Sequence, residues 1–207
     1  MKNKIARHYY IPEAETVFPK ADESHLIDPE PVILRLAAKQ DSKYAFLIAK
    51  EMRASALARG IGIAYRSVES ICEKMEKGHA VIATTTRGDW AGFCYLEVWE
   101  NGRFVSNSGM IVSPKYREQG IAKSLKRQIF DLSRNLFPNA HIFCITSGSA
   151  MMKLNSKFGF EPVSFTEITR DLNFWQGCQH CVNYSILESK KFKNCLCTAK
   201  FYEAGTQ

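Results

Sequence analysis

The segment from Val112 to Lys123 combines residue types that favour binding of an anion such as a phosphate. We expect a strand to end at Val112 and a helix to begin beside Gly120. The first backbone amides of a helix have no partner within it, and with the positive end of the helix dipole they attract negative charge. Gly120 and Ala122 are small enough to let a phosphate approach the main chain, and Arg117 adds charge at the rim. The sequence therefore predicts a pyrophosphate-binding turn, with an ordinary strand-to-helix turn as the alternative.

Two common phosphate-binding motifs do not fit this turn. It lacks the Gly-Lys-Ser/Thr of a Walker A loop, and it lacks the Gly-x-Gly-x-x-Gly spacing of a dinucleotide-binding fingerprint. The turn is therefore neither of these nucleotide-binding loops.

Four cysteines near the end of the chain have the spacing of metal ligands. They are Cys178, Cys181, Cys195 and Cys197. Cys-x-x-Cys is a turn that lets two thiolates hold one metal ion, and Cys-x-Cys on a strand places both side chains on one face. The spacing predicts a structural zinc ion that ties an insert at about residues 171–197, with His180 able to replace one thiol. Free or buried thiols and a redox pair are the alternatives.

The turn and a later helix together resemble a known family. The turn is similar to motif A of the GNAT N-acyltransferase superfamily, whose core is Q/R-x-x-G-x-G/A, in the run Val112-x-Pro114-x-Tyr116-Arg117-x-x-Gly120-Ile121-Ala122. The helix is similar to motif B of that family where it ends in Lys157-Phe158-Gly159-Phe160. The order of the expected elements also matches the family's fold from about residue 31 to residue 203.

This resemblance implies a single α/β (α+β) domain with a mixed central sheet flanked by helices. It implies acetyl-CoA or another acyl-CoA as donor, and a small-molecule primary amine that attacks the thioester directly. The residues implied to pair with the pantetheine arm through their main chain are Met110, Ile111 and Val112. Those implied to hold the pyrophosphate are Arg117 at the rim and the amides of Glu118, Gln119, Gly120, Ile121, Ala122 and Lys123. A homodimer formed through the last strands is also implied by the resemblance alone.

Two positions depart from the family's catalytic pattern. Many members use a Tyr as the acid for the departing thiolate, and that position is Asn155 here. An amide cannot donate a proton as an acid, so either Asn155 only hydrogen-bonds the sulfur or another group serves. The strand before motif A carries no Glu, and the nearest strand carboxylate is Glu97. Alternation places Glu97 on one face with Phe93, Tyr95 and Trp99, so we predict that it is the general base. A solvated or salt-bridged Glu97 is the alternative, and the two departures also leave open a module that senses acyl-CoA without turnover.

The elements that position these residues follow from the hydrophobic periodicity. We expect strands at 32–36, 80–85, 91–100, 104–112, 141–145, 163–169 and 196–202. We expect helices at 41–52, 67–78, 115–136 and 149–158. Asn101-Gly102 predicts a two-residue hairpin turn. Residues 1–30, with three prolines, predict an irregular arm before a domain that spans 31–207.

Composition and charge narrow the class of protein further. With 45% apolar and 24% charged residues, the 207-residue chain is an ordinary globular protein rather than a disordered or coiled-coil one. The formal net charge of +7 suits anionic ligands, which include the phosphates of CoA and an acceptor with carboxylates such as a free amino acid. No basic helix has the spacing of a base reader, so a nucleic-acid partner is disfavoured. Since neither an apolar span nor a signal-peptide core is found, we expect a cytoplasmic protein without a membrane partner.

Overall fold

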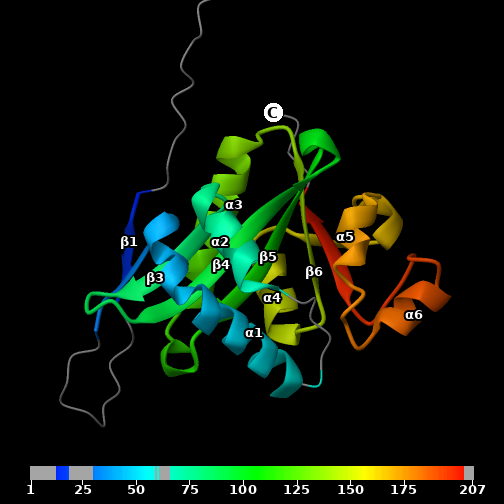
Figure 1. Cartoon of the computed structure of the whole chain (residues 1–207). Coiled ribbons are helices and arrows are strands. Elements are labelled where there is room, and N and C mark those ends of the chain that lie inside the picture. The colour runs from blue at the N-terminus through cyan, green and yellow to red at the C-terminus, as the bar shows by residue number, and fades with distance from the viewer. Residues whose placement is uncertain (1–12, 19–29, 59, 61–65, 203–207) are drawn as a thin grey trace, which may run out of the picture.

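A mixed eight-stranded sheet forms the centre of the fold in a computed structural model, which describes residues 13–18, 30–58, 60 and 66–202 (Figure 1). The strand order is β1-β2-β3-β4-β5-β6-β8-β7. All neighbouring strands are antiparallel except β5 and β6, which are parallel. The predicted single mixed sheet flanked by helices is therefore confirmed.

The strands and helices have the following bounds. The strands are β1 (Glu15–Val17), β2 (Val32–Leu36), β3 (Ala80–Thr85), β4 (Trp90–Trp99), β5 (Phe104–Val112), β6 (His141–Thr146), β7 (Glu161–Val163) and β8 (Thr198–Tyr202). The helices are α1 (Ala45–Ala58), α2 (Val68–Glu76), α3 (Ile121–Leu136), α4 (Ser149–Lys157), α5 (Leu172–Gln176) and α6 (Tyr184–Ser189). None of the helices in the described part of the chain is long and apolar enough to cross a membrane.

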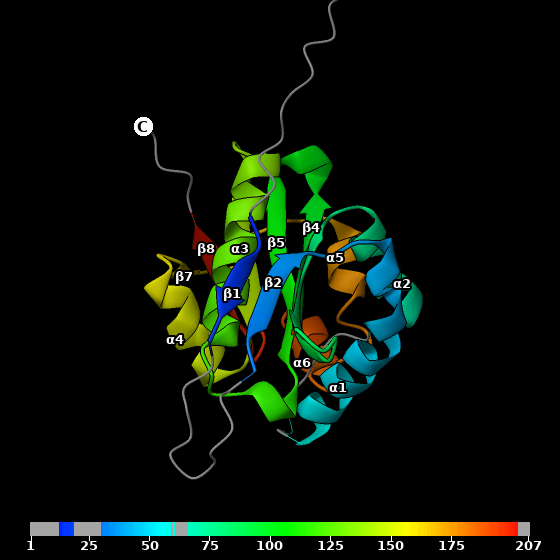
Figure 2. The same cartoon turned by 90° about the vertical axis from the view of Figure 1, so that its left-hand side faces the viewer.

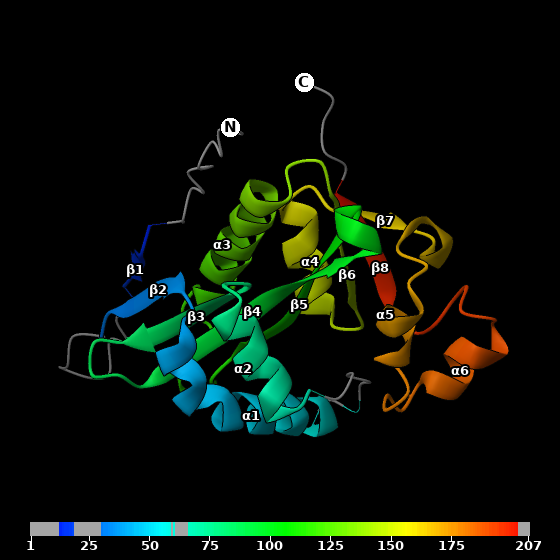
Figure 3. The ribbon, with the colours of Figure 1, turned by 45° about the horizontal axis from the view of Figure 1, so that its top comes forward.

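The helices cover both faces of the sheet. Helices α3 and α4 lie on one face, and α1 and α2 lie on the other, beside the segment that carries α5 and α6 (Figures 2 and 3). Helix α3 buries a stripe at helical spacing that includes Leu125, Ile129 and Leu132, which pack on the sheet. Helix α2 begins after Ser67, whose hydroxyl accepts a hydrogen bond from the amide of Ser70 at 3.1 Å, as an N-cap does.

The two parallel strands separate soon after they meet. The pairing of β5 with β6 runs only from Phe104 opposite His141 to Ser106 opposite Phe143. Beyond Ser106, β5 stays paired with β4 on its other edge and β6 stays paired with β8 (Figure 3). The main-chain groups of residues 107–112 that face β6 consequently have no strand partner.

A bulge marks the same stretch of β5. The register of β4 and β5 shifts between Phe93 and Tyr95, and Gly109 has a φ of +61°. A Cβ on Gly109 would clash with the ring of Tyr95. Because only glycine adopts this conformation without a side chain in the way, Gly109 lets Tyr95 pack over the bulge.

Several expectations about the elements need correction. The hairpin after Trp99 is not a two-residue turn, since Trp99 pairs with Phe104 and four residues form the loop. In that loop Glu100, Asn101 and Gly102 all have positive φ. Of the strand expected at 163–169, only Val163 lies in a strand, as the last residue of β7, and Phe165–Glu167 form a 3₁₀ turn. The helix expected at 41–52 starts as a 3₁₀ segment, Lys39–Tyr44, and continues as α1 to Ala58.

Part of the irregular arm expected at residues 1–30 is a strand in the structure. Residues 15–17 form β1, an edge strand antiparallel to β2, because the side chain of Glu15 accepts from Ser124 at 2.9 Å and so ties the segment to α3. The rest of that prediction, at residues 1–12 and 19–29, lies outside the described residues.

Candidate functional site

The turn before α3 presents open backbone amides, as expected. Gly120 precedes the helix with a φ of +85°, and the amides of Lys123 and Ser124 donate to its carbonyl at 2.9 and 3.3 Å. These are the first bonds of the helix, so the amides of Ile121 and Ala122 are left without a partner inside it. A Cβ on Gly120 would meet nothing within 4 Å. The space in front of these amides is therefore open.

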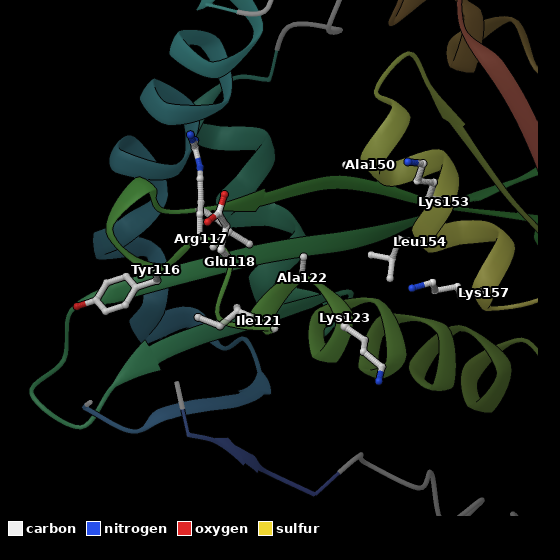
Figure 4. A pocket seen from close by; sticks show the side chains of 12 residues that line it. Tyr116, Arg117, Glu118, Ile121, Ala122, Lys123, Ala150, Lys153, Leu154 and Lys157 are labelled. Atoms are coloured by element: carbon white, nitrogen blue, oxygen red, sulfur yellow. The ribbon is translucent and has the colours of Figure 1, made fainter. Parts of the chain in front are cut away.

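A cleft of about 360 Å³ runs from this turn to α4. Figure 4 shows Lys153, Leu154 and Lys157 on α4 facing Ala122 and Lys123 on α3. An adjoining cleft of about 520 Å³ shares Lys123 and Lys157 and adds the side chain of Arg127. Five cationic residues thus line the two neighbouring hollows beside a helix N-terminus, together with the carboxylates Glu118 and Asp131. The five are Arg117, Lys123, Arg127, Lys153 and Lys157. This arrangement suits a ligand with several phosphates.

Two residues of the turn are placed differently from the expectation. The guanidinium of Arg117 turns toward α1, where it donates to Glu51 at 2.7 Å and to Ser55 at 2.8 Å. The carboxylate of Glu51 consequently neutralises part of the positive charge that Arg117 was expected to add at the rim. Glu118 has a φ of +64°, and its side chain points away from α4 (Figure 4). Only the main chain of Glu118 remains as a candidate ligand group.

The strand residues implied to pair with pantetheine lie on the open edge of β5. Met110 and Val112 are half-buried, and Ile111 is buried among apolar side chains that pack under α1 and α2. On their other edge these residues pair with β4, in the register Phe93 to Ile111 and Gly92 to Val112. An extended arm with amide groups fits such an edge, because it can hydrogen-bond like an added strand. The open edge and the lysine-lined cleft together fit an acyl-CoA.

Asn155 lies inside the protein rather than on an open surface. Its side chain is 1% exposed, and its Oδ1 has no hydrogen-bond partner. Hydrogen bonding by Asn155 lowers the pKa of Cys144 on β6, while burial raises that pKa by a larger amount. The amide of Asn155 therefore lies near a thiol of the protein, and its oxygen is an unsatisfied buried acceptor.

Glu97 forms a shielded ion pair on the opposite face of the sheet. Its Oε1 lies 3.0 Å from Nζ of Lys74 on α2, and both side chains are less than 20% exposed. Two residues before it, the hydroxyl of Tyr95 accepts a hydrogen bond from Nε of Arg66. Burial raises the pKa of Tyr95 to about 12, so this phenol stays protonated near neutral pH. Glu97 is thus salt-bridged, and it shares its face with the aromatic Tyr95 as alternation predicted.

A polar strip continues from this pair across the sheet. In the register of β4 and β5, Ser106 lies opposite Glu97 and Ser108 lies opposite Tyr95. The hydroxyl of Ser106 accepts from Trp99 Nε1 at 3.0 Å and from Ser108 Oγ at 3.2 Å. The strip separates the apolar cluster under α1 and α2 from a second cluster under α5 and α6. It reaches the part of β5 where the pairing with β6 ends.

The four cysteines gather in the segment around α5 and α6. Cys178, Cys195 and Cys197 pack against one apolar cluster. Cys181 Sγ accepts from the amide of Asn183 at 3.4 Å. Burial first, and then the neighbouring thiols, raise the pKa of Cys178 to about 11 and that of Cys197 to about 12.

The structure does not support the predicted zinc site at these thiols. Among the described residues, which include all four cysteines, no three His, Cys, Asp or Glu side chains are arranged to hold a metal ion. Three of the thiols, those of Cys178, Cys195 and Cys197, instead pack against one apolar cluster.

Sequence reasoning missed several residues of the site. Lys153 and Lys157 are four residues apart on α4, and this spacing on one helix face is the signal that could have found them. Arg66 and Lys74 carry no such signal, because their contact with Tyr95 and Glu97 depends on how α2 packs against the sheet.

Comparisons with known proteins agree with this geometry. The family model described as "Acetyltransferase (GNAT) family" matches residues 64–160. That span contains the turn before α3, the open edge of β5 and α4. No curated protein matches the sequence of this chain.

Solved structures resemble the fold at low sequence identity. N-acetylglutamate synthase from Neisseria gonorrhoeae, complexed with coenzyme A and N-acetyl-glutamate, has a TM-score of 0.60 and 18% identity, over 84% of this chain and 35% of that one. The present chain therefore spans about a third of that enzyme. A Mycobacterium tuberculosis protein in complex with CoA has a TM-score of 0.59 and 14% identity, over 82% of this chain and 98% of that one. A Salmonella typhimurium protein with acetyl-CoA has a TM-score of 0.57 and 13% identity, over 85% and 95% of the two chains.

Proposed function

We propose that this chain, whose residues 64–160 match the GNAT acetyltransferase family model, transfers an acetyl or another short acyl group from acyl-CoA to a primary amine. One observation carries this proposal. The cleft with the open amides of the α3 N-terminus leads along the open edge of β5 to a polar strip that contains Glu97. A phosphate-binding end and a proton-accepting end are thus joined by a strand edge that suits pantetheine.

The donor side of the site is built from main chain and lysines. The amides of Ile121 and Ala122 bind the pyrophosphate, and Lys123, Lys153 and Lys157 supply the opposing charge. The edge of β5 at residues 110–112 pairs with the arm and thereby orients the thioester. When bound, acyl-CoA supplies the activated acyl group.

The acceptor side lies on the opposite face of the sheet, where Glu97 is the proposed general base. Glu97 takes a proton from the ammonium of the acceptor, directly or through a water molecule, so that the free amine can attack the thioester. Lys74 holds the carboxylate in place at 3.0 Å. The neighbouring cations Arg66 and Lys74 favour an acceptor that also carries a carboxylate, which is the chemistry of a free amino acid.

A second candidate is a module that binds acyl-CoA without turnover. It is favoured by Asn155, because an amide cannot protonate a leaving thiolate and this one already lies near Cys144. The two candidates share the donor site and differ only in whether an amine is acylated.

A transfer assay separates the two candidates. The purified full chain is incubated with acetyl-CoA and a panel of amines that contains amino acids, their carboxamides and polyamines. Release of free CoA thiol and the mass of the acylated product are both measured. We expect an acetylated amino acid, with one CoA released per product, and a weaker reaction with the matching carboxamide. Binding of acetyl-CoA with no product from any amine would favour the sensing module, and no binding of any CoA species would contradict both.

A further inference from the structure

A buried lysine of α3 lies next to β5, near the point where β5 and β6 separate. Lys126 of α3 is 1% exposed, and its Nζ lies 3.4 Å from Oδ1 of Asn107 and 3.8 Å from the ring centre of Phe160. Among the described residues, Asn107 supplies the only oxygen found within hydrogen-bonding distance of this ammonium, and no carboxylate pairs with it. Burial lowers the pKa of Lys126, so its proton is held less tightly than that of a surface lysine.

Packing alone does not account for a lysine at this position. An ammonium with one long hydrogen bond is costly to bury, whereas an apolar side chain of similar length would pack there without that cost. The nearby Lys200 provides a contrast. Although it is also buried, Lys200 donates to Ser156 Oγ at 2.6 Å and to the carbonyl of Phe160 at 3.2 Å. Lys200 thus has two hydrogen-bond acceptors, whereas Lys126 has one long hydrogen bond and a cation–π contact with the ring of Phe160.

Two further polar side chains with incomplete hydrogen bonding, those of Cys144 and Asn155, lie near Lys126. Cys144 on β6 is close enough for the charge of Lys126 to lower the pKa of its thiol, although burial raises that pKa more. Asn155 of α4 is close enough to lower the pKa of this thiol slightly, and its own Oδ1 is buried without a hydrogen-bond partner. Three elements, α3, β6 and α4, thus bring incompletely satisfied polar groups to one place.

These polar side chains lie near the open edge of β5, and that position indicates what they could contact. The last paired residues of the two parallel strands are Ser106 and Phe143. Asn107 and Cys144 are the next residues, so they lie where the open edge begins. Asn107 is half-buried and links Lys126 to that edge. A ligand arm that pairs with residues 110–112 and continues along β5 ends beside Asn107.

We propose that Lys126 protonates the sulfur of CoA as it leaves, the role for which Asn155 is unsuited. This inference rests on the proposed acyl transfer. The bond between the amine nitrogen and the acyl carbon forms, the carbon–sulfur bond breaks, and the ammonium of Lys126 gives a proton to the sulfur. The acceptor nitrogen loses two protons, of which one passes through Glu97 to solvent and the other restores the Lys126 ammonium. A lysine with a weakened hold on its proton is suited to this exchange near neutral pH.

The test measures the thiol of bound CoA rather than activity alone. Thiolate absorbance of the CoA complex is followed against pH for the wild type, K126M, K126R and K200M, and the dissociation constant of desulfo-CoA is measured for each. A cation next to the sulfur lowers the pKa of a bound thiol by about 1–3 units. We expect that lowering in the wild type, K126R and K200M, and its loss in K126M. Desulfo-CoA binds equally to all four, because it has no sulfur for Lys126 to contact.

Turnover gives a second readout. K126M is expected to lower kcat by about 10²–10³-fold without changing the KM for acetyl-CoA, since a missing proton donor affects the transition state and not binding. K126R keeps the charge but donates its proton poorly, so its kcat is low while its bound thiol titrates as in the wild type.

The outcomes separate this inference from the proposed function. If the wild type binds neither CoA nor desulfo-CoA, the proposed function itself fails. If the wild type binds both and its bound thiol titrates like that of free CoA, Lys126 is not near the sulfur and the inference is overturned, even if K126M fails to fold. The same thiol pKa in folded K126M and in the wild type would also overturn it.

Discussion

At the scale of single residues, the site depends on charges that the fold shields from water. Glu97 and Lys74 lie 3.0 Å apart with less than a fifth of either side chain exposed, so their attraction is stronger than that of a surface pair. On the other face of the sheet, Lys126 has one oxygen partner among the residues that the structure describes. The two residues lie on opposite sides of one strand pair, which places a proton acceptor and a proton donor on either side of the thioester's expected path.

Replacement of Glu97 tests the acceptor side of this arrangement. E97Q keeps the shape of the side chain but removes the proton acceptor, so we expect kcat to fall by about 10²–10⁴-fold. The KM for acetyl-CoA should stay the same, because the donor binds to the other face. Steady-state kinetics over a pH series check both expectations. E73Q is the matched control, since Glu73 lies on the exposed side of α2 in a pair with Lys77. An E97Q variant as active as E73Q would show that Glu97 is not the base.

The residues that the sequence could predict are those whose role is local. Gly120 precedes a helix, and its open amides follow from that position in the chain. Lys126 could not be found in this way, because it lies next to Leu125 in an amphipathic helix and resembles any lysine at the edge of an apolar stripe. Only packing of α3 against β5 and β6 reveals that its side chain is buried.

At the scale of elements, the strands and long helices follow from periodicity, while short elements are set by their surroundings. The expected bounds of β2, β3 and β5 agree with the structure. The loop at Glu100–Gly102 is not the two-residue turn that Asn-Gly favours, because the side chain of Glu100 hydrogen-bonds another segment of the chain. Its carboxylate accepts from Thr169 at 2.9 Å and from the amide of Arg170 at 2.7 Å. Contacts with a distant segment thus outweigh local turn preference.

The segment around α5 and α6 makes a pH-dependent prediction. The pKa of Cys178 is raised to about 11 and that of Cys197 to about 12, from an ordinary value of 9.0. A thiol with a raised pKa stays protonated, and hence unreactive, until the pH approaches that value. We expect alkylation of both cysteines by iodoacetamide to be slow at pH 7–9 and to rise only above about pH 10, as read by peptide mass spectrometry.

Two outcomes would contradict this account of the cysteines. Rapid labelling of Cys178 or Cys197 at pH 7 in the folded protein would show that their thiols are not shielded. Protection that disappears when a chelator is added would show that a metal ion, rather than burial, holds the sulfurs.

At the scale of the whole molecule, the proposed reaction depends on the separation of two strands in the centre of the sheet. Because β5 and β6 part after three paired residues, the centre of the sheet offers an open strand edge between its two helical layers. The cations of the cleft beside α3 and α4 lie at one end of that edge, and the ion pair of Glu97 lies across it. The mixed sheet could be predicted from the order of the elements. The width of the opening between β5 and β6, and the identity of the lysines that line the cleft, could not be predicted. Both depend on how α4 packs against α3.

The measurement that tests the central claim most directly is calorimetric titration of acetyl-CoA into the wild type, G120E and G102E. Both glycines have a positive φ, +85° and +91°, and both face open or nearly open space, so the two substitutions carry the same strain and charge. Only G120E places a carboxylate against the open amides of α3. Like charges in contact cost several kcal/mol, so we expect G120E to bind at least about 100-fold more weakly and G102E to bind as the wild type does. Equal affinity in all three proteins would contradict the assignment of this turn as the CoA-binding site.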